Sequence, residues 1–290
     1  MLNRKIIDTI IETTIFICGI LSIVFVILIF TFLLKEGLSF FKSFGITKFL
    51  SGNLWLPESD PAQFGILPLI LGSILVTLGA CVIAVPLSIM SALYISEIAP
   101  KTLRDILKSF VELMAAVPSV VLGFVGMVTL VPAIKNLLNI PTGLTAFSGS
   151  LILALMAMPT IVTISEDAIH SVPCQYKEGA LAIGATKWQT IRRIVLKAAR
   201  PGIIAAIMLG IGRVIGETMA VMMITGNAAQ IPSSIFEPVR TMTATIAAEM
   251  GETVKGGIHY KSLFAIGLVL FAITFIVNFI ADLFSGKSKK

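Results

Sequence analysis

TTIFICGILSIVFVILIFTFLL, residues 13–34, is a continuous apolar run without a charged side chain. About 20 apolar residues in an α-helix cross the ~30 Å hydrocarbon core of a bilayer, so this run predicts a transmembrane helix. The whole chain is similar in character, because 56% of its residues are hydrophobic and 13% are charged, with a mean hydropathy of +0.98. The sequence therefore predicts an all-α membrane protein with six spanning helices, at about 13–34, 68–95, 109–133, 146–165, 202–225 and 262–284.

The basic residues are distributed unevenly between the two sets of connecting segments. Lys and Arg are retained on the cytoplasmic side of a membrane, so the richer side is predicted to be cytoplasmic. That side holds Arg4, Lys5, Lys101, Arg104, Lys108, Lys177, Lys187, Arg192, Arg193, Lys197, Arg200, Lys287, Lys289 and Lys290. The opposite side holds Lys35, Lys42, Lys48, Lys135, Arg240, Lys255 and Lys261. Both termini are thus predicted to be cytoplasmic, and topology explains the net charge of +6 without a nucleic-acid partner.

Motifs typical of enzymes are weak in this chain. The Gly-Lys-Ser of the C-terminal SGKSKK follows a hydrophobic span, and Ala281 stands where a phosphate-binding loop has its first glycine. The histidines, His170 and His259, fall in loops on opposite predicted faces and cannot share a site. The three cysteines are widely separated and show no metal-binding spacing. We therefore expect no catalytic site, no metal site and no bound cofactor in this chain.

The segment EGALAIGATKWQTIRRIVL, residues 178–196, is basic and amphipathic although apolar runs flank it. On a helical wheel Trp188, Ile191, Ile194 and Val195 gather on one side, opposite Gln189, Thr190, Arg193 and Lys197. Two interpretations remain open from these residues. The helix lies on lipid headgroups, or it docks into a groove on a cytoplasmic partner.

The same segment resembles the EAA loop of ABC importer permeases. The resemblance rests on Glu178-Gly179-Ala180, on Gly184 six residues after Glu178, and on Ile194 and Leu196 beyond it. Gly179 replaces the usual alanine, and Lys197 stands where proline is expected. The resemblance implies a type I permease fold in which residues of about 167–200, including Trp188, couple the membrane domain to an ATP-hydrolysing subunit.

Arg213 and Glu217 are charged residues placed deep within a predicted span. At a rise of 1.5 Å per residue, Arg213 lies about 20 Å along a helix counted from Arg200. Charges at this depth cost roughly 2.5–3.5 kcal/mol each, so they face an interior pathway or a partner. At a spacing of four residues the two share a helix face. They form a structural ion pair, or Arg213 offers hydrogen bonds to a passing oxyanion while Glu217 orients it.

A narrower resemblance lies in GRVIGETMAVMMITGN, residues 212–227, and FEPVRTMTATIAAEMGE, residues 236–252. Both are similar to PstC-type permease subunits of phosphate-specific ABC transporters. The resemblance implies a second permease subunit (PstA type), two copies of a cytoplasmic ATPase (PstB type) that carries the ATP-Mg, and an external phosphate-binding protein (PstS type). It places the permease core at 65–285, after an N-terminal helix and external loop at 1–64 and before a basic tail at 286–290.

Two other functions remain open. The first is a permease for sulfate or molybdate, which has the same architecture. This alternative stays open because the selectivity for the anion lies largely in the external binding protein. A self-sufficient secondary carrier is the alternative of another class, but many carriers are built from internal repeats, and no obvious repeat relates the two halves of this sequence. The long outward segment 226–260 is too polar to span, and its TMTATIAAEM stretch predicts a partial helix over the external end of the pathway.

Overall fold

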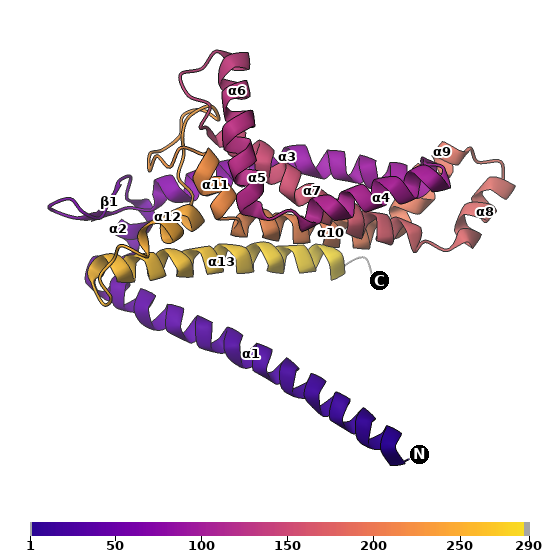
Figure 1. Cartoon of the computed structure of the whole chain (residues 1–290), viewed down its shortest axis with the longest axis horizontal. Helices are drawn as coiled ribbons and strands as arrows, with labels where there is room; N and C mark the ends of the chain where they lie inside the picture. The colour runs from indigo at the N-terminus through magenta and orange to yellow at the C-terminus, as the bar shows by residue number, and fades with distance from the viewer. Residues whose placement is uncertain (1, 287–290) are drawn as a thin grey trace.

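The computed structural model describes residues 2–286, most of which are helical. Helices α3 (Leu67–Leu93), α7 (Ala146–His170) and α10 (Leu196–Gly216) pack against one another at the centre of an elongated bundle (Figure 1). The long helix α13 (Ile258–Gly286) lies beside them. Helix α1 (Leu2–Phe44) packs against α13 near its own C-terminal end and diverges from the bundle toward its N-terminal end.

Within the described residues, six helices are long and apolar enough to cross a membrane. This confirms the predicted class, an all-α membrane protein with six candidate spans. The predicted runs 13–34, 68–95, 146–165 and 262–284 fall on four of these helices, whereas the third and fifth runs have different bounds. The six candidates are Asp8–Phe44, Leu67–Ile98, Ser119–Leu138, Ala146–His170, Lys187–Gly216 and Ile258–Ile280.

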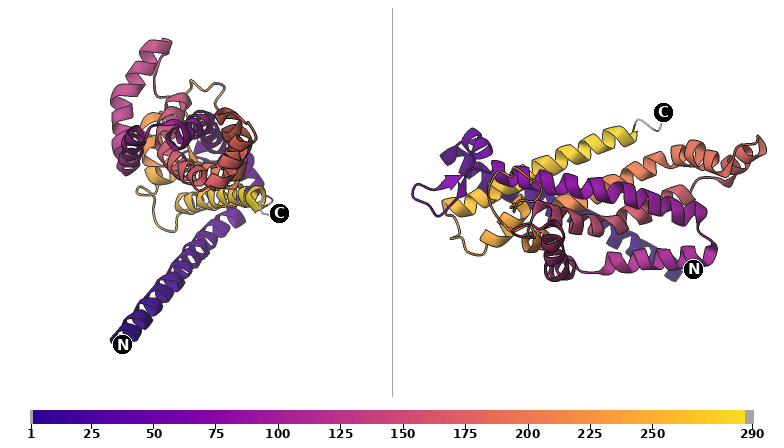
Figure 2. Two further views of the ribbon diagram at one scale, coloured as in Figure 1. Left: turned by 90° about the vertical axis from the view of Figure 1, so that its right-hand side faces the viewer. Right: turned by 90° about the horizontal axis from the view of Figure 1, so that it is seen from above.

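The predicted run 109–133 is not one helix. Helix α4 (Lys101–Ala116) is followed by Val117, whose ψ of 126° is extended, and α5 (Ser119–Val125) begins after Pro118. The proline ring disfavours the helical conformation of the residue before it, which explains the break. Chain direction changes there, and α5 continues through a π-helical turn into α6 (Val131–Leu138), which projects away from the central helices (Figures 1 and 2).

The predicted run 202–225 is also divided. Helix α10 ends at Gly216, Glu217 is extended with φ −70° and ψ 135°, and the short helix α11 (Met219–Ile224) follows. No proline marks this break. It is stabilised by contacts from another segment, because the Thr243 hydroxyl donates a hydrogen bond of 2.8 Å to the Glu217 carbonyl oxygen. The sequence could not indicate this division, since the stabilising residue lies far along the chain.

Small residues bring the central helices together. A Cβ at Gly79 on α3 would lie 2.4 Å from the Ser150 hydroxyl of α7, so only glycine fits without a shift. Ser150 donates a hydrogen bond of 3.1 Å to the carbonyl oxygen of Val76 on α3. Close approach of this kind is how membrane helices gain packing energy when lipid is as apolar as their side chains.

The outer end of the molecule is defined here as the end opposite the connection between α7 and α10. It contains α2 (Ile46–Ser51), the two-stranded sheet of β1 (Trp55–Leu56) and β2 (Gln63–Phe64), and α12 (Met242–Glu249). Its core packs aromatic residues of 40–64 against α12 and α13. Helix α12 confirms that the TMTATIAAEM stretch forms a partial helix.

Candidate functional site

The connection between α7 and α10 projects from the end of the bundle opposite the outer end (Figure 1). It consists of α8 (Cys174–Ala182), a turn, and α9 (Lys187–Thr190), which passes through a π-helical turn at Ile191–Val195 into α10. Helix α1 begins and α13 ends on this same side of the molecule. The structure therefore places the segment that resembles a coupling loop at an exposed end of the bundle.

Gly184 shapes the turn between α8 and α9. Its φ of +84° lies in the left-handed region that favours glycine, and its N–H bonds the Leu181 carbonyl oxygen at 3.0 Å. The next helix begins with a capping box, because the Thr186 hydroxyl accepts from the backbone N–H of Gln189 and the Gln189 side chain accepts from the N–H of Thr186. A Cβ at Gly184 would meet no atom within 4 Å, so this glycine is required by the backbone and not by packing within the chain.

Four bulky apolar residues of the connection are exposed, and we refer to them together as the coupling patch: Tyr176, Leu181, Ile183 and Trp188. Ile183 is 86% exposed and Trp188 is 57% exposed, which is unusual for side chains of this size outside lipid or an interface. Tyr176, Leu181 and Ile183 were not predicted as site residues. Their signal in the sequence is that they are bulky apolar residues within a polar connecting segment.

The wheel-based grouping of Trp188 with Ile191, Ile194 and Val195 is wrong. Ile191 and Val195 are buried in the core between α7 and α10, whereas Trp188 is exposed, and Thr190 is buried although it was assigned to the polar side. The wheel assumes 3.6 residues per turn, but the π-helical turn at Ile191–Val195 changes that period. Trp188 therefore points away from the residues that hold the loop to the bundle.

The seven predicted coupling residues divide into two groups. Glu178, Gly179, Gly184 and Trp188 are exposed and available to a partner, while Ala180 is buried and Ile194 and Leu196 are half-buried against the bundle. The first group can contact another protein and the second attaches the loop to α10. One loop thus combines an outward surface with a rigid connection into a central helix.

Ion pairs add to this attachment. Lys177 of α8 pairs with Glu97, which follows α3, and Lys108 of α4 bonds the buried Glu166 carboxylate of α7 at 2.8 Å. The hydrogen bond to Glu166 raises the pKa of Lys108 above its ordinary value, so the lysine keeps its charge. The first ion pair therefore links the connection to the segment after α3, and the second links α4 to α7.

Arg213 lies in the last turn of α10, where the helix dipole favours a positive charge. Its guanidinium donates a hydrogen bond of 3.0 Å to the Thr160 hydroxyl on α7, and the residue is exposed at the surface of the chain. Within the described residues no ion pair joins Arg213 to an acidic group. Thr160 was missed by the sequence analysis, because nothing in the pattern of α7 indicates which hydroxyl faces an arginine on another helix.

The prediction that Arg213 and Glu217 share one helix face is wrong, and the structure does not form the ion pair that was one of the two alternatives. Because α10 ends at Gly216, Glu217 lies beyond the helix, and its carboxylate accepts a hydrogen bond of 3.3 Å from the N–H of Ala220 in α11. The Glu217 carboxylate thus bonds the first turn of α11, and Glu217 lines a narrow hollow together with Ser73, Thr77, Thr241 and Thr243. Arg213 therefore lies in the last turn of α10 and Glu217 at the break itself, and Arg213 keeps donors available for another acceptor.

Comparisons with known proteins agree with this architecture. The family model of the binding-protein-dependent transport system inner membrane component matches residues 84–290. The chain is 37% identical to the probable ABC transporter permease protein YqgH of Bacillus subtilis, over 94% of this chain and 89% of the relative. It is 37% identical to the phosphate transport system permease protein PstC of Mesorhizobium japonicum, over 83% of this chain and 78% of the relative. It is also 31% identical to PstC of Pasteurella multocida, over 100% and 95%.

Solved structures share the fold. A bacterial alginate ABC transporter in complex with a pentasaccharide-bound periplasmic protein matches with a TM-score of 0.65 at 17% identity, over 92% of each chain. The MetNI methionine ABC transporter in an inward-facing conformation matches with a TM-score of 0.57 at 18% identity, over 78% of this chain and 95% of that chain. With an all-helical bundle, six candidate spans and a family match that covers most of its length, the chain belongs to the family of binding-protein-dependent transport system inner membrane components.

Proposed function

We propose that this chain is the membrane-spanning permease subunit of an ATP-driven importer of inorganic phosphate. The proposal is supported by the several PstC relatives, which are named for phosphate transport and align with most of the chain. The observation that carries it within the molecule is Arg213, a permanently charged and exposed guanidinium near the outer end of a membrane-spanning helix. Such a residue is costly in lipid and is expected to face a pathway or a partner.

Arg213 is suited to a transient anion site. Its planar guanidinium presents several N–H donors that match the oxygens of phosphate, and Thr160 occupies one of them. Because the Glu217 carboxylate bonds the N–H of Ala220 and does not pair with Arg213, the positive charge stays available to an anion. The carboxylate across the break keeps the region from becoming strongly positive, so the anion is released as readily as it is bound.

ABC importer permeases work with other subunits, and we propose the same for this chain. A second permease of the PstA type completes the pathway, and a PstB-type ATPase dimer, which holds the ATP-Mg, binds the coupling patch. A PstS-type phosphate-binding protein docks at the outer end. Both termini and the coupling patch are then cytoplasmic in the bacterial or archaeal inner membrane, as the basic residues predict. The chain itself carries no ATPase site in this arrangement.

Reconstitution tests the cargo and the energy source together. The complete complex in liposomes is expected to take up radiolabelled phosphate only with ATP inside and the binding protein outside. Excess sulfate or molybdate should not compete. Competition by either anion would favour the sulfate or molybdate alternative, and uptake by this chain alone without ATP would favour a secondary carrier.

Substitution of Gly184 tests the turn of the coupling loop. Gly184→Leu places a Cβ in the left-handed region at a cost of about 1–2 kcal/mol, and we expect reduced ATPase retention and uptake. Gly184→Asn should retain both, because asparagine tolerates this conformation. Gly179→Ala is the matched control, since its Cβ meets nothing within 4 Å and its backbone is helical. Unchanged uptake by the Gly184→Leu complex would contradict the role of this turn.

A further inference from the structure

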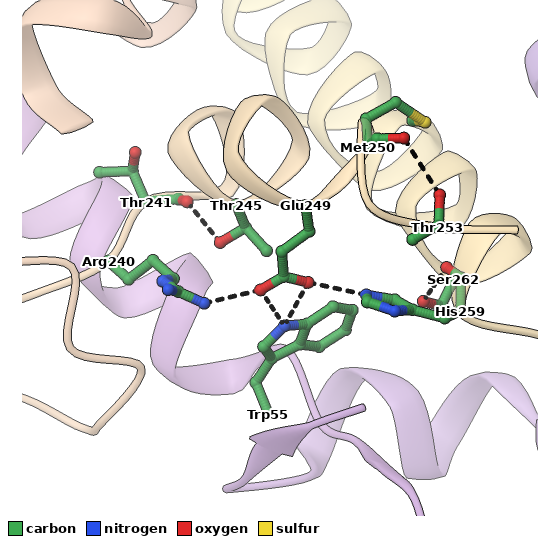
Figure 3. A network of polar contacts seen from close by, with 9 residues as sticks. All are labelled: Trp55, Arg240, Thr241, Thr245, Glu249, Met250, Thr253, His259 and Ser262. Atoms are coloured by element: carbon green, nitrogen blue, oxygen red, sulfur yellow. Dashed lines mark hydrogen bonds and ion pairs between the residues drawn. The ribbon is translucent and has the colours of Figure 1, made fainter. Parts of the chain in front are cut away.

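Glu249, the last residue of α12, is the centre of a polar network at the outer end (Figure 3). Its carboxylate accepts hydrogen bonds from the indole nitrogen of Trp55 at 3.0 and 3.1 Å and from the Arg240 guanidinium at 2.7 Å. The ring nitrogen Nε2 of His259 lies 2.8 Å from its second oxygen. Trp55 belongs to β1, Arg240 precedes α12, and His259 lies in the first turn of α13, so one carboxylate connects three segments.

The opposite end of α12 is attached to the α10–α11 break. The Thr243 hydroxyl donates to the Glu217 carbonyl oxygen, and the backbone N–H of Met242 donates to the Ser73 hydroxyl of α3 at 2.9 Å. Thr241 caps the helix through the N–H of Ala244. Helix α12 thus spans the distance between the Glu249 network and the break beside Arg213.

The network depends on Glu249 more than on any of its partners. The side chain is only 15% exposed, and the carboxylate is the shared acceptor for donors from all three segments. Its loss would leave Arg240 as a partly buried charge without its ion pair, which is a costly state. A hollow of about 430 Å³ beside the network is lined by the acidic residues Glu58 and Glu252 as well, so the site is not built to hold an anion.

We propose that Glu249 acts as a latch: its hydrogen bonds hold α12 in place over the α10–α11 break. The outer end opens only when these bonds are broken. The proposal rests on the proposed function only in taking the break as part of a transport pathway. Glu249 is a positioning residue in this account. It acts through α12 on Glu217 and Thr243 and does not contact the cargo.

Thiol labelling measures the opening directly. In the assembled complex, with Cys18, Cys81 and Cys174 of this chain replaced by alanine, Thr245→Cys introduces a thiol at a fully buried position of α12. We expect a membrane-impermeant thiol reagent, added outside, to label this cysteine about tenfold faster when Glu249→Gln is present, which corresponds to about 1.4 kcal/mol. Trp55→Phe, which removes one donor and keeps the ring, should give a smaller increase.

Glu252→Gln is the matched control, because it removes the same charge from the same hollow. Within the described residues the Glu252 side chain has no hydrogen bond or ion pair, so the labelling rate should stay unchanged. A cysteine at Lys101 should resist the external reagent in every variant. Equal rates of thiol labelling in the three complexes, which carry Glu249→Gln, Trp55→Phe or Glu252→Gln, would overturn the latch. The readout needs no cargo, so a different transported anion would refute the proposed function and leave this result intact.

Discussion

Neutralising Arg213 should reduce phosphate uptake by about 10- to 100-fold, because a hydrogen bond to a charged group contributes about 1.5–3 kcal/mol. The Arg213→Gln complex is expected to assemble in the membrane and to hydrolyse ATP, since the coupling patch is unchanged and lies at the other end of α10. Both results can be measured on the same proteoliposomes. Uptake of radiolabelled phosphate should fall, while ATPase activity should be retained. Arg200→Gln, the same chemical change at an exposed position of α10, should retain most of the uptake.

The double variant distinguishes an anion site from a structural charge pair. If Arg213 only balanced Glu217, removing both charges with Arg213→Gln and Glu217→Gln would restore uptake, because no uncompensated charge would remain. The structure leads to the opposite expectation, since the two side chains are bonded to Thr160 and to the N–H of Ala220 and not to each other. The double variant should stay as inactive as Arg213→Gln. Uptake near the unmodified rate would show that the pathway lies elsewhere.

Placing a charge in the coupling patch should detach the ATPase. Buried apolar anchors at protein interfaces each contribute about 2 kcal/mol or more, a factor of about 30, so Ile183→Asp combined with Trp188→Asp is expected to lower ATPase affinity by about 30- to 900-fold. Co-purification of the ATPase with the affinity-tagged permease measures the loss. Insertion of the helices should not change, because both side chains are exposed and contribute little to the folded chain.

Val254→Asp provides the control for this effect. Val254 is 81% exposed in the turn after α12, at the outer end, so it undergoes the same change of an exposed apolar residue to an acid. The ATPase should co-purify with this variant as it does with the unmodified chain. Retention of the ATPase by the Ile183→Asp, Trp188→Asp complex would mean that the coupling patch faces lipid headgroups, which is the alternative interpretation of this segment.

The helical membrane class could be predicted because it depends on properties that each segment carries by itself. A long apolar run without charges forms a helix in a bilayer whatever surrounds it, since its backbone groups must be bonded within the segment. The turn at Gly184 and the capping box at Thr186 are equally local, because they involve residues within six positions of one another. The break at Pro118 is local as well, although the predicted single run 109–133 passed over it.

The chemistry of the candidate site was decided by contacts between distant segments. Arg213 bonds Thr160, 53 residues away, and the Thr243 hydroxyl that stabilises the break at Glu217 lies 26 residues beyond it. Trp55 and Glu249 are 194 residues apart. By itself, the sequence determined how many helices are fit to cross the membrane and which connecting segment resembles a coupling loop. Only the packed bundle decided which polar groups pair, because a buried donor bonds the acceptor that folding brings within about 3 Å, however far apart the two lie in the chain.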